Sequence, residues 1–492
     1  MSTPAPVEID TRLEMFVEDS LIERLEGQAT LRLQQPVPRE ESLVTDRPWE
    51  GNMCGYMTVF RDGPTCRLYY KGWAVDLLHP ESRDGELHLP HEPVIAMAVS
   101  DDGIRWQRPQ LGLHEFAGSR DNNIVWRAAE PLWKGMHGFS PFADRNPAAA
   151  PEVRYRAVGA AWDSTKGLFA LQSPDGVRWA LTQDTPIMTG CAFDSQNLAF
   201  WDTVRGEYRA YMRDVGPDWY RGIKTATSSD FLHWTVPEWL EYPGAPAEQL
   251  YTNQVLPYSR APHYFLGFPT RYVERPWSPS IEALPELEHR RLRAANHPRY
   301  GTALTDGLFM ASRDGRRFKR WDEAFIRPGL RTEGSWAYGD CYQCWGMLET
   351  ASALPGAPRE LSVYAPERYW RGPATVFRRH TLRLDGFVSL HAPLGGGELV
   401  TKPISFQGNR LQLNISTSAG GSARVELLRP EGGAPIAGFT LAECHDIIGD
   451  TLAYTVQWQN GADLQQLAGE PVRLRFVLHD ADLFSYQFQP GT

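Results

Sequence analysis

The chain has 492 residues, of which 42% are apolar, so it can bury at least one large core, and its length favours two or more domains. Its 60 acidic and 50 basic side chains are evenly spread, with a formal charge of −10 and no basic stripe that could neutralise a phosphate backbone. Nucleic acid is therefore excluded as an expected partner.

Targeting signals and cysteine spacing give few clues to the function of the chain. The first residues contain acids and no apolar run of signal-peptide length, and no later segment reaches the roughly 18 apolar residues of a membrane span. We therefore expect a cytoplasmic protein without a membrane partner. Cys341 and Cys344 form one C-x-x-C pair with no second pair to complete a zinc site, and six cysteines make no disulfide framework in so long a chain. No cofactor and no metal ion is predicted.

A repeated motif organises most of the chain. The pattern Ser-x-Asp-(Gly/Phe)-x-x-(Trp/Phe) begins at Ser100, Ser173, Ser228 and Ser312, and a degenerate copy begins at Arg383. Each of the first four copies follows an apolar or alternating run, and Asp-Gly favours a tight turn, so the motif predicts the hairpin between the last two strands of a unit. Another hairpin precedes each copy. Five units of four strands predict an all-β, five-bladed β-propeller.

After about residue 386 the pattern changes to short alternating strands separated by Gly-rich turns, such as residues 399–406 and 471–478. These strands predict a C-terminal β-sandwich over residues 387–492, which leaves residues 1–386, with an N-terminal strand segment, to the propeller. A helix-like stretch near residues 279–297 is predicted as an insertion in the fourth unit. Loops inserted on one face of a scaffold often carry its binding site.

The entrances of the innermost strands are the predicted location of a site, because those strands line the central channel of a propeller. In chain order these entrances supply Trp49, Glu50, Asp144, Asp194, Tyr251, Asn253, Glu333, Trp336 and Asp340. Three further candidates, Arg213, Asp214 and Arg271, lie in or after the second strands of units three and four.

Carboxylates around one pocket suit the cleavage of a glycosidic bond. The reaction needs an acid that protonates the leaving oxygen and a second carboxylate on the opposite side of the anomeric carbon. Mutual repulsion and partial burial would raise the pKa of one of them, so that it stays protonated near neutral pH. Acids in such turns also cap local amides, so a purely structural role stays open for each.

The order of elements resembles that of the invertase- and inulinase-type glycoside hydrolases of family 32 and their relatives in families 68 and 43. The stretch WEGNMCGYMTVFRDG is similar in layout to their first blade, FADRNP before RYRAVGAAW to their second, and FDSQNLAFWD to their third. The resemblance implies Glu50 as nucleophile, Asp144 as transition-state stabiliser and Asp194 as general acid/base. The W-M-N-D-P-N-G, R-D-P and E-C signatures of those families are absent, which implies a divergent member or a separate family whose substrate need not contain fructose.

We therefore expect a retaining glycoside hydrolase or transglycosylase that acts on a small oligosaccharide or glycoside. Residues expected to bind this carbohydrate substrate are Trp49, Arg213, Asp214, Tyr251, Asn253, Arg271, Glu333, Trp336 and Asp340. Two alternatives stay open: an inverting enzyme or sugar phosphorylase, which a cluster of basic residues such as Arg145, Arg213 and Arg271 would favour, and a non-catalytic carbohydrate-binding propeller, whose funnel would be aromatic with few acids. A homo-oligomer also stays open.

Overall fold

The computed structural model describes residues 5–127, 134–161, 163 and 166–491. Strands account for 44% of the residues and helices for 7%, which confirms the prediction of a chain built almost wholly from β-structure. Within the described ranges, no helix has the length and apolar character needed to cross a membrane. The chain divides into two compact units, one of residues 36–258 and 262–381 and a smaller one of residues 1–35, 259–261 and 382–492.

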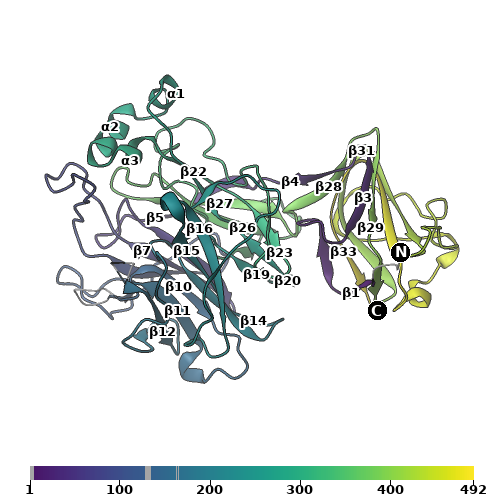
Figure 1. The fold of residues 1–492 in the computed structure, drawn as a ribbon, viewed down its shortest axis with the longest axis horizontal. Helices are drawn as coiled ribbons and strands as arrows, with labels where there is room; N and C mark the ends of the chain where they lie inside the picture. The colour runs from purple at the N-terminus through teal and green to yellow at the C-terminus, as the bar shows by residue number, and fades with distance from the viewer. Residues whose placement is uncertain (1–4, 128–133, 162, 164–165, 492) are drawn as a thin grey trace. The chain divides into compact units, whose positions relative to one another are not determined.

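Five four-stranded sheets form most of the larger unit in the part of the chain that is described (Figure 1). The first contains β6 (Gly55–Asp62), β7 (Thr65–Gly72), β8 (Val94–Ser100) and β9 (Ile124–Trp126). The second contains β10 (His137–Ala143), β11 (Tyr155–Ala160), β12 (Leu168–Ser173) and β13 (Ala180–Leu181). The third contains β14 (Leu198–Asp202), β15 (Glu207–Val215), β16 (Arg221–Ser228) and β17 (Glu238–Trp239).

The last two of these sheets include strands from distant parts of the sequence. The fourth contains β19 (Leu256–Tyr258), β20 (Ala261–Gly267), β23 (Met310–Ser312) and β24 (Lys319–Arg320). The fifth contains β25 (Leu348–Thr350), β26 (Glu360–Glu367), β27 (Val376–Arg383) and, as its fourth strand, β5 (Val37–Val44) from near the N-terminus. A smaller sheet joins β18 (Gln249–Leu250), β21 (Thr270–Val273) and β22 (Leu304–Gly307).

The repeated motif forms the turn after the third strand of a sheet. Ser100 ends β8, and its hydroxyl accepts a hydrogen bond from the Gly103 amide at 2.9 Å. The Asp102 carboxylate accepts the amides of Ile104 and Arg105 at 2.7 and 2.9 Å. The same bonds recur after β12, β16 and β23, so the Ser and Asp of the motif satisfy backbone amides that the turn would otherwise leave unpaired.

In three copies of the motif, the aromatic residue that ends it packs against the preceding sheet. Its ring meets a tyrosine of that sheet edge-on, with ring centroids about 6 Å apart, a favourable aromatic geometry. The pairs are Trp106 with Tyr364 (5.9 Å), Trp179 with Tyr69 (6.3 Å) and Phe318 with Tyr211 (6.3 Å). The first of these pairs joins the first sheet to the fifth.

The N-terminal residues up to Gln35 belong to the smaller unit, whereas the predicted propeller range 1–386 placed them in the larger one. In that unit β2 (Leu13–Met15) pairs with β33 (Arg473–Gln489), β3 (Ile22–Gly27) with β29 (Gly397–Thr401), and β4 (Thr30–Leu33) with β28 (Val388–Ala392). The long strands β31 (Arg410–Leu428) and β33 also pair, with β32 (Asp450–Thr455) beside β31. The short β1 (Val7–Asp10) runs parallel to β30 (Ile404–Phe406).

Three helices lie in and just after the insertion predicted near residues 279–297, together at one end of the larger unit: α1 (Pro279–Glu282), α2 (Leu287–Asn296) and α3 (Pro298–Thr302) (Figure 1). Buried arginines hold α2 in place. Arg293 is 1% exposed and donates hydrogen bonds to the carbonyls of Tyr338, at 3.3 Å, and Tyr369. The insertion therefore fixes two segments whose tyrosine side chains line the cavity described next.

Candidate active site

A cavity of about 620 Å³ lies in the larger unit. Residues in or just before the first strands of four sheets reach it: Tyr56 in β6, His137 in β10, Asp194 before β14 and Tyr251 before β19. The other lining residues are Met53, Trp73, Leu87, Arg213, Val215, Asp218, Trp219, Arg221, Gln249, Glu274, His297, Arg299, Tyr300, Tyr338, Tyr369 and Trp370. Segments far apart in sequence thus meet at one site.

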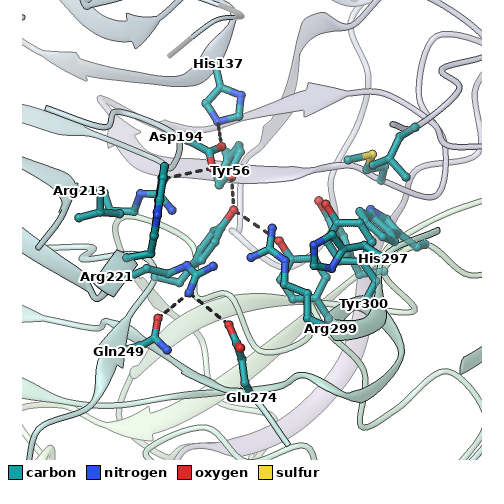
Figure 2. A pocket seen from close by; sticks show the side chains of 18 of the residues that line it. Tyr56, His137, Asp194, Arg213, Arg221, Gln249, Glu274, His297, Arg299 and Tyr300 are labelled. Carbon is teal, nitrogen blue, oxygen red and sulfur yellow. Dashed lines mark hydrogen bonds and ion pairs between the residues drawn. The ribbon is translucent and has the colours of Figure 1, made fainter. Parts of the chain in front are cut away.

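Asp194 lies between two nitrogen-bearing side chains (Figure 2). Its Oδ1 is 3.2 Å from His137 Nε2, its Oδ2 is 3.1 Å from Arg213 Nη2, and 50% of its side chain is exposed. Burial raises the pKa of Asp194, but the His137 imidazole and the Arg213 charge outweigh this effect and hold that pKa well below its ordinary value. Asp194 is therefore an ionised carboxylate at neutral pH, accessible from the cavity.

A buried lysine, Lys71, contacts His137. Lys71 Nζ lies 3.4 Å from His137 Nδ1 and 3.4 Å from the centre of the Trp73 ring, and the residue is 1% exposed. Burial lowers the pKa of Lys71 well below its ordinary value, and burial together with the Lys71 charge lowers the pKa of His137. A neutral His137 can donate from Nε2 toward Asp194 while Nδ1 accepts from Lys71.

Tyrosine hydroxyls gather on the wall beside Asp194. The Tyr251 hydroxyl lies 3.5 Å from the hydroxyls of Tyr56 and Tyr338. Burial raises the pKa of all three phenols well above the ordinary tyrosine value, so they stay protonated and can donate hydrogen bonds.

A second polar group faces Asp194 from the other side of the cavity, as Figure 2 shows. Arg221 donates to Gln249 Oε1 at 2.5 Å and lies 3.6 Å from Glu274 Oε1. The Arg221 guanidinium also stacks on the Tyr272 ring, 4.3 Å from its centre. Glu274 thus provides a second, partly exposed carboxylate in the lining.

The prediction that Glu50 faces the same funnel is wrong. Its side chain is fully buried and does not line the cavity. Its carboxylate accepts Arg108 Nε at 2.8 Å, Arg108 Nη2 at 2.9 Å, the Tyr70 hydroxyl at 2.5 Å and the Arg47 amide at 3.1 Å. These four bonds occupy the lone pairs that a nucleophile would need.

The prediction for Asp144 is also wrong, because the strand begins earlier than its sequence suggested. Strand β10 starts at His137 and ends at Ala143, so Asp144 follows the far end of the strand and His137 occupies the entrance. The Asp144 side chain is buried and accepts Arg156 Nε at 2.8 Å and the Tyr208 hydroxyl at 2.6 Å. It stabilises its own turn and the neighbouring strands.

The other candidates divide between the cavity and its surroundings. Tyr251 and Arg213 line it, whereas Asn253 is buried behind it and donates to the Gln196 carbonyl at 3.2 Å. Asp214 pairs with Lys224 at 2.7 Å. Arg271 is held by Asp306 at 2.7 Å and Glu248 at 2.8 Å, so neither of these charged groups reaches the cavity lining.

The candidates of the fifth sheet and Trp49 also lie outside the lining. Trp49 donates to Asn123 Oδ1 at 2.7 Å and Trp336 to the Gly329 carbonyl at 3.0 Å. Glu333 is exposed over 87% of its side chain. Asp340 is buried, accepts the Ala337 amide at 2.9 Å, and has its pKa raised to about 7 by burial.

Several cavity residues were not predicted. His137 directly precedes the apolar run GFSPFA, so an earlier strand start would have found it. Arg299 and Tyr300 lie just beyond the insertion that was expected to cover a site, but no motif marks them. Arg221 and Glu274 have no distinguishing sequence context.

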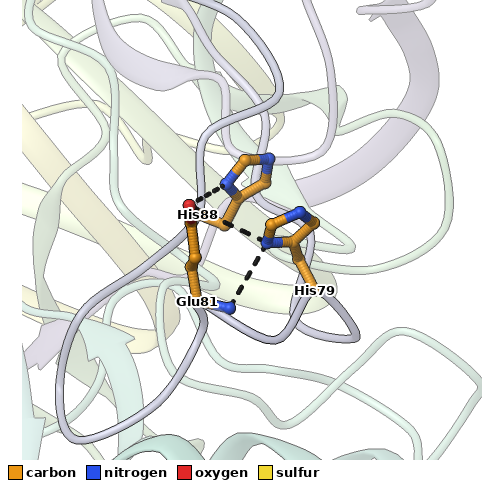
Figure 3. Close-up of side chains that lie close together, drawn as sticks. All are labelled: His79, Glu81 and His88. Carbon is orange, nitrogen blue, oxygen red and sulfur yellow. Dashed lines mark hydrogen bonds and ion pairs between the residues drawn. The ribbon is translucent and has the colours of Figure 1, made fainter.

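One group of side chains could hold a metal ion. His79, Glu81 and His88 bring their ligand atoms within 4.8 Å of one another (Figure 3). His88 Nδ1 lies 3.0 Å from Glu81 Oε2, and His79 Nδ1 accepts the Glu81 amide at 3.3 Å. These contacts satisfy the group without an ion, and none of its members lines the cavity. All six cysteines are buried and free, so the C-x-x-C pair forms no disulfide.

The cavity can thus offer an ionised carboxylate, protonated phenols, cationic groups and aromatic ring faces. Its lining contains eight tyrosines and tryptophans, three arginines, two histidines and three carboxylates. Such a surface can stack on sugar rings and bind their hydroxyls.

No protein-family model matches the chain, and no curated protein matches it. Similar solved structures include a thermostable family-43 glycoside hydrolase, with 12% identity over 68% of this chain and 91% of that chain and a TM-score of 0.42. A glycosyl hydrolase from Bacteroides ovatus has 15% identity over 73% and 96% of the chains, with a TM-score of 0.39. The β-1,2-mannobiose phosphorylase from Listeria innocua has 11% identity over 70% and 96%, with a TM-score of 0.44.

Family 43, which the name of one of these structures gives, is also one of the families that the order of elements resembles. At these identities and TM-scores the likeness does not define the reaction, which has to be inferred from the cavity itself.

Proposed function

We propose that the five four-stranded sheets are the blades of a five-bladed β-propeller whose central funnel is the cavity, and that the smaller unit is a β-sandwich. Two observations support closure of the ring of blades. Strand β5 completes the fifth sheet beside β27, and Trp106 of the first sheet packs on Tyr364 of the fifth. The approach of first-strand residues to one cavity also fits this arrangement.

We further propose that the protein cleaves a glycosidic bond of a small oligosaccharide or glycoside, with Asp194 as its principal catalytic carboxylate. The observation that carries this proposal is the position of Asp194, ionised and half exposed, in a cavity whose lining includes eight tyrosine and tryptophan side chains. The cavity volume of about 620 Å³ suits a small ligand.

The low pKa of Asp194 favours a role as base or nucleophile over the general-acid role that the resemblance implied. A retaining pair of carboxyl groups lies about 5–5.5 Å apart, and an inverting pair lies further apart because a water molecule must fit between. We assign Glu274, a lining residue seen across the cavity from Asp194 in Figure 2, as the second carboxyl group of an inverting pair. In this scheme Asp194 removes a proton from the attacking water, and Glu274 protonates the leaving oxygen.

The test compares the parent protein with D194N and E274Q on a panel of aryl glycosides and oligosaccharides, with product anomers followed by NMR. Because general-base catalysis contributes roughly 10²–10⁴-fold, D194N should lose at least two orders of magnitude in kcat. D218N, which changes an exposed carboxylate at the same cavity, is the matched control and should keep parental turnover. Parental turnover in D194N, with folding checked by circular dichroism, would contradict the proposal.

A second candidate function is carbohydrate binding without turnover. The observation that favours it is the lining itself, which is aromatic with only three carboxylates. In that case oligosaccharides of the panel would bind, D194N would bind them as well as the parent does, and no product would form from any of them.

A further inference from the structure

Arg299 lines the cavity and forms no ion pair with a carboxylate of the described residues. It belongs to α3, and its Nε is buried without a hydrogen-bond partner among the described residues. The ion pairs formed by the described part of the chain do not include it. Its guanidinium carbon lies 5.2 Å from the centre of its neighbour's ring, Tyr300.

The other two arginines of the lining differ from Arg299 in this respect. Arg213 is paired with Asp194 at 3.1 Å, and Arg221 is close to Glu274 at 3.6 Å. Two of the three carboxylates in the lining are therefore already engaged. The third, Asp218, is exposed and forms no ion pair with Arg299 within 4.0 Å.

The surroundings of Arg299 also leave polar atoms for a ligand. Figure 2 shows His297, Arg299 and Tyr300 together on one side of the cavity. His297 Nδ1 is buried and has no hydrogen-bond partner in the described ranges. Tyr300 stacks on Tyr338, with ring centroids 5.7 Å apart, so the wall beneath Arg299 is aromatic and uncharged.

Backbone contacts of α3 hold Arg299 in place. The Arg299 carbonyl accepts the Ala303 amide at 2.8 Å, and α3 packs so tightly on α2 that a Cβ at Gly301 would lie 2.3 Å from the Arg290 carbonyl oxygen. Arg299 is therefore presented to the cavity by a close-packed pair of helices, which lowers the entropy cost of using it as a receptor.

We infer that Arg299 receives an oxyanion group of the ligand, a carboxylate or a phosphate, so that the cavity takes an acidic sugar or a sugar together with inorganic phosphate. A guanidinium binds either oxyanion through two parallel charge-assisted hydrogen bonds, which a neutral sugar hydroxyl does not match. This inference rests on the proposed carbohydrate function of the cavity and specifies the chemistry of its ligand.

The experiment measures binding to the full-length protein by isothermal titration calorimetry with three probes: glucuronate, glucose as its neutral counterpart, and inorganic phosphate. The parent should bind at least one anionic probe more tightly than glucose. R299Q should weaken that anionic probe by about 10- to 100-fold, the range expected for losing a charge-assisted hydrogen bond, and leave glucose unchanged. R291Q, which removes an exposed arginine of α2 outside the lining, is the matched control and should bind as the parent does.

The probes distinguish the two sources of the oxyanion. Binding of glucuronate that phosphate does not displace assigns the group to an acidic sugar, whereas phosphate binding that turnover requires assigns it to a phosphorolytic reaction. The inference is overturned if the parent prefers neither anion to glucose, or if R299Q weakens all three probes equally. If R299Q does not fold, two other measurements test the inference. They are the preference of the parent for an anionic probe over glucose, and the affinity for that probe of R299K, which keeps the charge but not the planar guanidinium fork.

Failure of the proposed catalytic function would look different. In that case D194N and the parent would both lack turnover, while the anionic probe would still bind in an Arg299-dependent manner. Loss of the Arg299 effect with intact D194N-sensitive turnover would overturn the inference alone.

Discussion

Replacement of Glu50 by Gln separates the structural role assigned to this residue from the nucleophile role that the resemblance implied. The substitution removes the charge opposite Arg108 and leaves one carbonyl oxygen to serve four donors. It removes no group from the cavity. We therefore expect E50Q to lose stability and to keep turnover per folded molecule.

The size of the loss follows from the burial of the pair. Breaking a buried ion pair by removing one partner costs about 3–5 kcal/mol. Arg108 is 17% exposed and has a second partner, Asp46, at 3.3 Å, so part of its charge stays compensated. We expect E50Q to lower the free energy of unfolding by about 2–4 kcal/mol, which is at or slightly below the range for breaking a buried ion pair.

The assay is urea unfolding followed by tryptophan fluorescence, together with kcat on the best substrate of the glycoside panel. D46N is the matched control: it changes an exposed acid on the same arginine and should cost about 0–1 kcal/mol. The reasoning is refuted if E50Q unfolds at the parental urea concentration but has lost its turnover, because that result would make Glu50 a catalytic group.

Three further predictions concern the pH dependence of stability and the packing of the insertion. The pKa of Asp194 is lower in the folded than in the unfolded protein, so its contribution to stability is present above its unfolded pKa and is lost as the pH falls toward the folded value. Urea unfolding between pH 3 and 6 should show a shallower acid-side loss in D194N, and identical slopes would contradict this. The pKa of Asp340 is raised to about 7, so stability should fall as the pH rises from about 4 through 7. D340N should flatten this fall, and an unchanged profile would argue against the buried carboxylate. G301A should destabilise the protein by roughly 1–3 kcal/mol, because the new methyl group collides with the Arg290 carbonyl. A parental melting temperature for G301A would refute the close packing of α2 and α3.

The repeat was the most informative part of the sequence for the fold. The Ser and Asp of the motif bond to amides within a few residues, so their pattern is local and marks the end of the third strand in the first four sheets. The partners of the N-terminal strands could not be predicted in this way. Strand β2 pairs with β33, more than 450 residues later, and no local signal encodes such a pairing.

The candidate site was predictable in part. Asp194 and Tyr251 were found because they precede apolar runs that form first strands. Asp144 was misplaced because the entrance of the second sheet was set at the stretch SPFADRNP, whereas β10 begins earlier, at His137, and continues through Pro141, opposite Ala157. Strand β10 is at the edge of its sheet, where a residue without an amide hydrogen is tolerated. Glu50 was misassigned because its partner Arg108 lies 58 residues away in a loop.

The role inferred for Arg299 in α3 could not be predicted from the sequence, for a different reason. The inference for Arg299 rests on the absence of a carboxylate partner among the described residues. That absence depends on the three-dimensional placement of Asp194, Asp218 and Glu274. A sequence gives the number of charges but not which of them are paired.

The most direct test of the central claim is the ratio of kcat between the parent and D194N on a glycoside that the parent turns over, measured beside D218N. We expect D194N to lose at least 100-fold, within the range for general-base catalysis, while its fold and its affinity for the ligand persist and D218N stays at the parental rate. Equal kcat values for the parent and D194N would contradict the account, because Asp194 would then have no catalytic role.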